Sequence, residues 1–314
     1  MVEAAPRDGL VVASHGRHCV VETEDGSRRI CHPRGKKSQA VVGDRVLWQP
    51  PPAGRGEEGT VEAVQPRRNL FYRQDELRTK SFAANLDQIL ILLAAEPVFS
   101  EMQLARALIA AEAAGIAPLI ALNKSDLPEA WERAWERLAP YRAMGTPAHY
   151  TVLPLSVSQA PDATRQALAP LLAGKTTLVL GPSGAGKSTL VNLLAPGAAV
   201  LTAEISQALN SGRHTTTSTA LYWLDAARST ALIDSPGFQE FGLHHIAPTE
   251  LARCMPDIAA HAADCRFYNC SHLHEPGCGV ISALKIAPGA GGISESRYKI
   301  YSALHAELSA APRY

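Results

Sequence analysis

Two nucleotide-binding motifs occur in this chain in an unusual order. Residues 181–189 are GPSGAGKST, a pattern typical of a loop that holds the phosphates of a nucleotide. Residues 123–126 are NKSD, a pattern typical of a loop that recognises guanine, and they come first. In most proteins with both motifs the phosphate loop precedes the guanine loop. Any fold for this chain must bring the two loops together in the opposite order.

The phosphate-loop pattern G-x-x-x-x-G-K-S begins directly after an apolar strand pattern at 176–181 and opens a helix pattern at 188–196. This context favours a phosphate loop over a plain glycine-rich turn, since glycines let backbone N–H groups approach an oxyanion at a helix N-terminus. Lys187 is expected to reach the β- and γ-phosphates, and Ser188 to bind Mg²⁺. The expected GTP contacts in this loop are Gly181, Pro182, Ser183, Gly184, Ala185, Gly186, Lys187, Ser188 and Thr189.

The guanine-loop pattern follows another apolar strand, where ligands bind in parallel sheets. Asp126 is expected to accept hydrogen bonds from the guanine N1–H and amino group, which adenine does not offer. Asn123 would stabilise neighbouring loops, and the stem of Lys124 would cover the base; Ser125 completes this loop. The alternative is a turn in which Asp126 caps the helix predicted at 127–141.

Two further elements complete a nucleotide site. LSVS (155–158) occupies the place of a Ser-Ala loop that contacts the guanine oxygen, with Ser156 as the expected contact and valine in place of alanine. DSPG (234–237) follows the strand pattern TALI. Asp234 would hold Mg²⁺ through water and Gly237 would sense the γ-phosphate, although this tetrapeptide alone also fits a turn.

The motif order NKSD, LSVS, GPSGAGKS, DSPG is the usual GTPase order after rotation. Joining the old chain ends near residue 174 and cutting after DSPG leaves every strand in place. Since chain termini often lie close together, such a permutation is physically tolerable. We therefore infer a circularly permuted GTPase domain.

The catalytic residue is less well defined. In SGRHTTTST (211–219), His214 is a candidate for orienting water, and Thr215, Thr216 and Thr217 compete as the Mg²⁺ ligand that binds once GTP is present. GTPases often have glutamine directly after DxxG, but Phe238 occupies that position here. We therefore predict slow intrinsic hydrolysis that a partner accelerates.

The rest of the chain predicts further domains. From about residue 85, strand patterns alternate with helix patterns, which indicates a doubly wound parallel sheet. Residues 9–64 show short alternating apolar runs typical of a small antiparallel barrel. A basic segment within them is either a solvated loop or a nucleic-acid contact. Its cations are Arg28, Arg29, Arg34, Lys36 and Lys37.

Near the C-terminus, three cysteines and a histidine form a C-x4-C-x-H-x5-C run. Three thiolates and one imidazole suit a closed, structural tetrahedral Zn²⁺ site. The candidate ligands are Cys265, Cys270, His272 and Cys278, with His274 as the competing histidine. A helix pattern at 296–310 closes the chain.

Composition sets wider limits. The chain has 30 basic and 30 acidic residues among 314, so its overall charge does not indicate nucleic acid binding. Its start lacks the pattern of a secretory signal. The apolar run at 89–95 is far shorter than the ~18 residues of a membrane span. We expect a cytoplasmic protein with no membrane partner.

Taken together, the barrel-like N-terminus, the permuted motif order, GRHTT, DSPGF and the cysteine-rich run resemble the bacterial RsgA (YjeQ) family, the ribosome small subunit-dependent GTPases. The resemblance covers nearly the whole chain, with Ser235 where threonine is frequent. It implies an OB-fold domain at 1–68, a permuted P-loop GTPase domain at 69–244 and a mainly helical zinc-binding domain at 245–314.

The resemblance also implies function. It implies GTP hydrolysis to GDP and phosphate, stimulated by the small (30S) ribosomal subunit, linked to late subunit maturation and coupled to release. It favours His272 over His274 as the zinc ligand, makes the basic segment an rRNA contact, and implies Mg²⁺ with GTP and a monomer. Two other classes of protein share some of these motifs. A metabolic or protein-modifying GTPase would need a second catalytic site, which the sequence does not show. A nucleic-acid-binding module with a vestigial GTPase is disfavoured by intact Lys187, Ser188 and Asp234.

Overall fold

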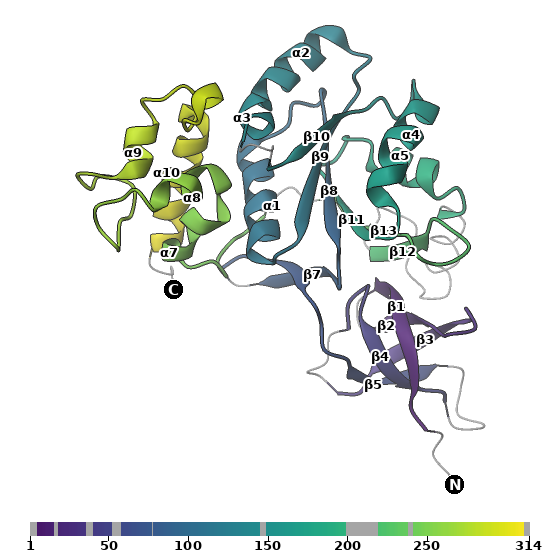
Figure 1. Ribbon diagram of the computed structural model, residues 1–314. Helices are drawn as coiled ribbons and strands as arrows, with labels where there is room; N and C mark the ends of the chain where they lie inside the picture. The colour runs from purple at the N-terminus through teal and green to yellow at the C-terminus, as the bar shows by residue number, and fades with distance from the viewer. Residues whose placement is uncertain are drawn as a thin grey trace.

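The fold was obtained as a computed structural model (Figure 1). It describes residues 5–15, 18–35, 40–51, 58–76, 78–144, 149–198, 219–237 and 241–310. Figure 1 shows a small barrel at the N-terminus, a central sheet with helices on both sides, and a group of C-terminal helices beside it. Among the described residues, no helix combines the length and the apolar character needed to cross a bilayer.

The N-terminal barrel has five strands in the order β1-β2-β3-β5-β4, and a further pairing of β1 with β4 closes it. Its strands are β1 (Arg7–His15), β2 (His18–Glu22), β3 (Arg28–Pro33), β4 (Arg45–Gln49) and β5 (Gly59–Val64). Alternate residues point inward. They form a separate core that includes Val11, Val21, Cys31, Trp48 and Val61. The barrel expected from the sequence is confirmed as an OB-like closed barrel.

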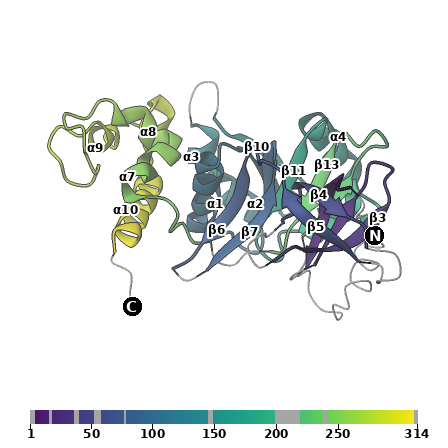
Figure 2. The same cartoon turned by 90° about the horizontal axis from the view of Figure 1, so that it is seen from below.

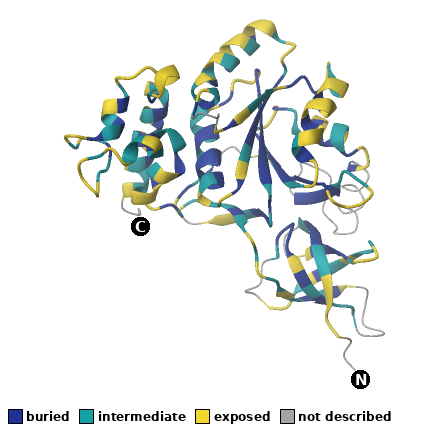
Figure 3. Ribbon diagram, viewed as in Figure 1, coloured by how far each residue is buried: buried dark blue, intermediate teal, exposed yellow. Residues whose placement is uncertain are grey.

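The central sheet has the order β10-β9-β8-β11-β13-β12, in which only β12 runs antiparallel to its neighbour. Its strands are β8 (Gln88–Ala94), β9 (Ala117–Asn123), β10 (Thr151–Pro154), β11 (Thr176–Leu180), β12 (Thr219–Trp223) and β13 (Ala231–Asp234). Every residue of β8 is buried, as expected for a strand covered on both faces (Figure 3).

The strand order confirms the permutation. Strand β11, which leads into the phosphate loop, lies between β8 and β13 and is parallel to both. The guanine-loop strand β9 lies on the far side of β8. Strand order along the sheet therefore reverses at the β8–β11 boundary, which is where ligands bind in open α/β sheets.

Helices cover both faces of this sheet, with α1, α2 and α3 on the side of the C-terminal helices and α4 and α5 on the other (Figures 1 and 2). Their bounds are α1 (Glu101–Ala113), α2 (Pro128–Arg137), α3 (Ala139–Arg142), α4 (Pro161–Leu172) and α5 (Lys187–Leu194). The single helix predicted at 127–141 is interrupted at Leu138. Pro140 explains the break, because it has no N–H with which to continue the helix.

A two-stranded ribbon, β6 (Leu70–Gln74) and β7 (Thr79–Ala84), connects the barrel to the central sheet. This ribbon was not predicted from the sequence. Beyond the central sheet follow α7 (Pro248–Leu251), η1 (Ala252–Cys254), α8 (Pro256–Ala262), α9 (Gly279–Ala283), η2 (Pro288–Ala290) and α10 (Glu295–Ser309).

The last helix is held against α8 and the central domain by polar contacts. Arg297, 1% exposed, donates from Nε and Nη2 to Asp257 at 2.8 Å each. Its guanidinium also lies 4.9 Å from the ring centroid of Tyr141 in α3. Arg106 of α1 forms an ion pair with Glu307 of α10. These contacts fix α10 on α8, α3 and α1.

The barrel is joined to the central sheet through its first strand. Ala13 and Ser14 of β1 pair with Ala220 and Thr219 of β12, so barrel and sheet form one continuous hydrogen-bonded surface. Beside this junction the buried carboxylate of Glu22 accepts a hydrogen bond from Trp223 Nε1 at 2.8 Å.

Replacing Trp223 with phenylalanine tests this junction. The variant keeps an aromatic ring but removes the donor to Glu22, and a hydrogen bond to a charged group contributes about 1.5–3 kcal/mol. We expect the free energy of unfolding to fall by about 1–2 kcal/mol, because Glu22 keeps its ion pair with Arg28. Urea unfolding measures this change. An unchanged midpoint and slope would show that the bond adds nothing to stability.

Candidate functional site

The guanine loop, the phosphate loop and the end of β13 converge on one cavity of about 1150 Å³. This volume is ample for a nucleoside triphosphate. Most of the expected contacts line the cavity. They are Asn123, Lys124, Asp126, Ser183, Gly184, Gly186, Lys187, Ser188, Thr189, Asp234 and Gly237. Residues more than 100 positions apart in the chain thus form one site at the carboxyl edge of the sheet.

The phosphate loop needs glycine at Gly186 for two reasons. Its φ of 99° lies in the left-handed region, and a Cβ there would stand 2.5 Å from Asn123 Nδ2. Any side chain would therefore strain the backbone and push the guanine loop away. Lys187 Nζ donates to the carbonyl of Gly181 at 2.9 Å and to that of Pro182 at 3.3 Å. The loop carbonyls thus hold the ammonium across the mouth of the loop.

Asn123 connects the nucleotide loops. Its Nδ2 donates to the carbonyl of Ala185 in the phosphate loop at 2.9 Å, and its Oδ1 accepts from the Val157 N–H at 3.0 Å. Asn123 is 4% exposed, so an unpaired amide would be costly there. Val157 stands where a Ser-Ala loop has alanine, and its backbone N–H is still available for this hydrogen bond. One side chain thereby fixes three loops relative to one another.

Asp126 is the carboxylate at the base end of the cavity. Its Oδ1 accepts a hydrogen bond from Ser156 Oγ, and Ser156 is itself buried. This bond orients the Asp126 carboxylate. Among the described residues, no donor forms a hydrogen bond with its other oxygen, Oδ2. Ser156 thus lies against Asp126 and does not line the cavity.

Asp234 carries the strongest electrostatic perturbation in the cavity. It is 9% exposed, and burial raises its pKa to about 6, against the opposing effect of Lys187. Burial in turn lowers the pKa of Lys187, which Asp234 partly offsets. At neutral pH Asp234 is mostly ionised in a poorly solvated position. A carboxylate there favours a cation, and with the Ser188 hydroxyl it offers the oxygen donors that Mg²⁺ prefers.

Some expected contacts lie outside the cavity lining. These are Ser125, Ser156, Gly181, Pro182 and Ala185. Ser125 is exposed and donates its N–H to the carbonyl of Leu155, while Ala185 is buried. His214, Thr215 and Thr216 lie outside the described residues, so the candidate catalytic segment stays a sequence prediction.

The cavity also contains residues that the sequence analysis missed. They are Arg73, Lys80, Phe82, Leu127, Ser158, Gln159, Ser235 and Pro236. Ser158, Ser235 and Pro236 lie within the predicted motifs, and Leu127 and Gln159 directly follow them. Arg73, Lys80 and Phe82 come from the β6–β7 ribbon instead. The alternating residues of LFYRQ and TKSFAA around a short polar turn are a hairpin signal that a search for strands could have found.

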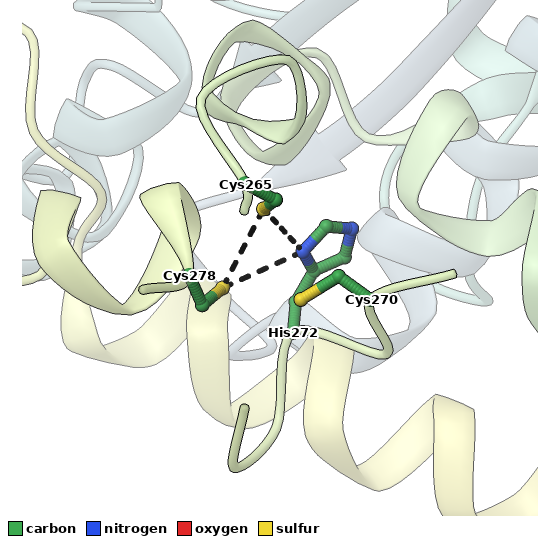
Figure 4. Close-up of side chains that lie close together, drawn as sticks. All are labelled: Cys265, Cys270, His272 and Cys278. Carbon is green, nitrogen blue, oxygen red and sulfur yellow. Dashed lines mark hydrogen bonds between the residues drawn. The ribbon is translucent and has the colours of Figure 1, made fainter. Parts of the chain in front are cut away.

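The cysteine-rich run forms a compact cluster between α8 and α9, against α10 (Figure 4). One ligand atom from each of Cys265, Cys270, His272 and Cys278 lies within 4.8 Å of all the others. Cys265 Sγ is 3.8 Å from Cys278 Sγ and 3.3 Å from His272 Nδ1. Cys278 Sγ is 3.6 Å from the same nitrogen. Such a cluster can bind a metal ion.

The surrounding chain holds the cluster in place. The hydroxyls of Tyr298 and Tyr301 in α10 donate to the carbonyls of His272 and Ser271, each at 2.9 Å. His272 is 6% exposed with a φ of 60°, and its ring faces the sulfur atoms. His274 is exposed and does not belong to the cluster. The turn at His272 therefore decides which histidine can act as a ligand.

The basic segment of the barrel is only partly described, and Lys36 and Lys37 lie outside the described residues. Arg28 forms an ion pair with Glu22 at 3.1 Å, and Arg34 forms one with Glu62. Arg29 is exposed and lines a barrel cavity of about 1590 Å³ together with Arg28. The two ion pairs weaken the positive field expected from the sequence.

Comparison with known proteins extends this picture. A family model described as RsgA GTPase matches residues 64–244. The chain is 70% identical over 302 residues to the small ribosomal subunit biogenesis GTPase RsgA of Variovorax paradoxus, covering 96% of this chain and 92% of that one. It is 54% identical to the protein of the same name from Burkholderia pseudomallei, with the same coverage.

Two solved structures match over nearly the full length. The crystal structure of YjeQ from Thermotoga maritima has a TM-score of 0.69 and 28% identity, covering 98% of this chain and 99% of that one. The structure of YloQ, a circularly permuted GTPase, also has a TM-score of 0.69, with 26% identity and coverage of 99% and 98%. Both comparisons include the barrel, the permuted sheet and the C-terminal helices.

Proposed function

Because the chain belongs to the RsgA family of GTPases, we propose that it hydrolyses GTP on the small ribosomal subunit and assists the late maturation of that subunit. Turnover would be stimulated by the subunit and coupled to release. The observation that carries the enzymatic part is the single cavity shared by the guanine loop, the phosphate loop and Asp234. The ribosomal part is supported by similarity over 96% of the chain to proteins named for small-subunit biogenesis.

We further propose roles within the cavity. Asp126 recognises guanine, and the phosphate loop with Lys187 binds the phosphates. Ser188 and Asp234 would hold Mg²⁺, which neutralises charge on the phosphates. The buried carboxylate of Asp234 beside an exposed serine hydroxyl fits this cation. Gly237 would sense the γ-phosphate, since a Cβ built at this residue would stand 3.1 Å from Lys187 Nζ and 3.7 Å from the Ser183 nitrogen.

For the cysteine-rich cluster we propose a structural zinc ion. Tetrahedral Zn²⁺ with Zn–S of about 2.3 Å and Zn–N of about 2.0–2.1 Å requires S–S separations of about 3.8 Å and S–N separations of about 3.6 Å. The cluster's separations of 3.8, 3.3 and 3.6 Å agree with these values. Four protein ligands leave no position for substrate, so the ion would stabilise the fold.

The division of labour among domains is also a proposal. Residues 1–68 would contact rRNA through Arg28, Arg29, Arg34, Lys36 and Lys37, 69–244 would bind and hydrolyse GTP, and 245–314 would bind zinc. His214 would orient the attacking water, with Thr215 or Thr216 on Mg²⁺. We propose that the protein acts as a cytoplasmic monomer.

The test is hydrolysis by the purified protein with and without small ribosomal subunits. We expect slow GTP turnover that rises at least about tenfold with the subunit, because a partner completes the catalytic site. ATP should remain inert, because Asp126 would find no N1–H donor on adenine. Large subunits serve as the matched control. Equal turnover with and without small subunits would contradict the ribosomal proposal and leave the GTPase assignment intact.

A further inference from the structure

One wall of the nucleotide cavity comes from outside the nucleotide-binding motifs. Arg73 of β6 and Lys80 of β7 both line the cavity, together with Phe82. The two cations are directly opposite each other in the antiparallel register of the ribbon. Directly opposed residues project from the same face of a two-stranded ribbon. The ribbon thus presents two adjacent positive charges to the space that holds the phosphate loop.

Two positive charges lie next to each other in this arrangement. Like charges directly opposite across two strands destabilise the pair. Partial burial lowers the pKa of Lys80, and the charge of Arg73 lowers it further. Among the described residues that line the cavity there are four cations, Arg73, Lys80, Lys124 and Lys187, but two carboxylates, Asp126 and Asp234. A phosphate group is the ligand that would relieve this excess.

The ribbon is anchored beside the switch motif. Gln74 accepts from the His244 N–H at 3.0 Å and donates its own N–H to the Gly242 carbonyl at 3.1 Å. Phe82 stacks on Phe241 with ring centroids 5.9 Å apart. The segment that follows Asp234–Gly237 is therefore attached to the ribbon that carries the two cations. On the other face of the ribbon, the ring centroids of Tyr72 and His245 lie 4.4 Å apart.

We propose that Arg73 and Lys80 bind the terminal phosphate of the bound nucleotide, so that the β6–β7 ribbon distinguishes GTP from GDP. This inference rests on the proposed nucleotide site. A guanidinium and an ammonium group are suited to phosphate oxygens, with Arg73 offering paired N–H donors. The phosphate backbone of rRNA carries the same chemistry. Arg73 and Lys80 line the same cavity as Lys187 and Asp234, which favours the nucleotide over rRNA as the source of the phosphate.

The experiment measures dissociation constants for GDP and for a non-hydrolysable GTP analogue, in the absence of ribosomes. The variants are Arg73→Ala, Lys80→Ala and the double variant. Arg78→Ala is the control, because it removes a cation from the same ribbon but faces a neighbouring cavity. We expect the double variant to lose about tenfold to hundredfold in affinity for the analogue and under about threefold for GDP. Arg78→Ala should bind both as wild type does.

Four results separate the alternatives. Equal losses for both nucleotides, or no loss, would overturn the inference. Normal nucleotide affinities with weakened binding to small subunits would assign the cations to rRNA and would also overturn it. Failure of wild type to bind the GTP analogue would instead contradict the proposed nucleotide site. The single variant Lys80→Ala guards against misfolding, because Lys80 is the more exposed of the two cations. Its far-UV circular dichroism and melting point should match those of wild type.

Discussion

An Asp126→Asn variant is expected to lose about 100-fold in affinity for GTP and to gain affinity for xanthosine triphosphate. In the proposed site the carboxylate accepts two hydrogen bonds from guanine, and bonds to a charged group are worth about 1.5–3 kcal/mol each. Asparagine offers an N–H donor in place of one acceptor. Xanthine has a carbonyl oxygen where guanine has its amino group, so the variant's donor meets an acceptor there. The amide oxygen can still accept from Ser156 Oγ, as Asp126 does.

Titration with fluorescent GTP, XTP and ATP analogues measures this exchange of preference. Glu129→Gln is the matched control, because it makes the same carboxylate-to-amide change at an exposed position in α2 outside the cavity lining. It should leave all three affinities unchanged. Retained preference for GTP over XTP in Asp126→Asn would show that another group reads the base.

Removal of the proposed zinc ion is expected to have the second large effect, on the folding of the C-terminal helices. Chelation leaves four buried or half-buried ligands facing one another without a cation, and Cys278→Ser leaves three of them. Structural zinc contributes about 10–16 kcal/mol to the folding of small zinc domains. We expect α9 and the loop at 265–278 to lose their protection, and α10 to lose the two tyrosine contacts with that loop. The central sheet should stay folded, because its own strands and helices supply most of the core cluster that the C-terminal helices also join.

Hydrogen exchange locates the loss of protection, and elemental analysis gives the metal content, expected at about one zinc ion per chain. His272→Ala and His274→Ala form a matched pair, because the two residues differ by two positions and only His272 belongs to the cluster. The first should lower the metal content and the second should not. The opposite result would exclude His272 as the ligand.

Much of this architecture was predictable because its signals are local. The phosphate loop is one contiguous stretch whose glycines, lysine and serine are all needed for the same chemistry. The apolar run of β8 and the alternation of the barrel strands follow directly from how many faces of each strand are covered. Even the permutation could be predicted, since it depends only on the order of four short motifs.

Other features depended on long-range contacts. Which of two neighbouring histidines joins the cluster is set by a backbone turn at His272, whose φ of 60° the sequence does not specify. The bridge from Asn123 to Ala185 spans 62 positions, and the ribbon cations are more than 100 positions from Lys187. Pattern arguments treat each segment separately, so they cannot pair such residues.

The sequence by itself determined the set of chemical parts: a phosphate loop, a guanine loop, a switch carboxylate, and three cysteines with two candidate histidines, in an order that requires permutation. Only the tertiary structure decided how these parts meet. It placed β11 between β8 and β13, joined the barrel to β12 and turned the β6–β7 ribbon toward the nucleotide cavity. The physical reason is that a motif's chemistry is carried by neighbouring residues, whereas its surroundings are set by hydrogen bonding and burial between segments far apart in the chain.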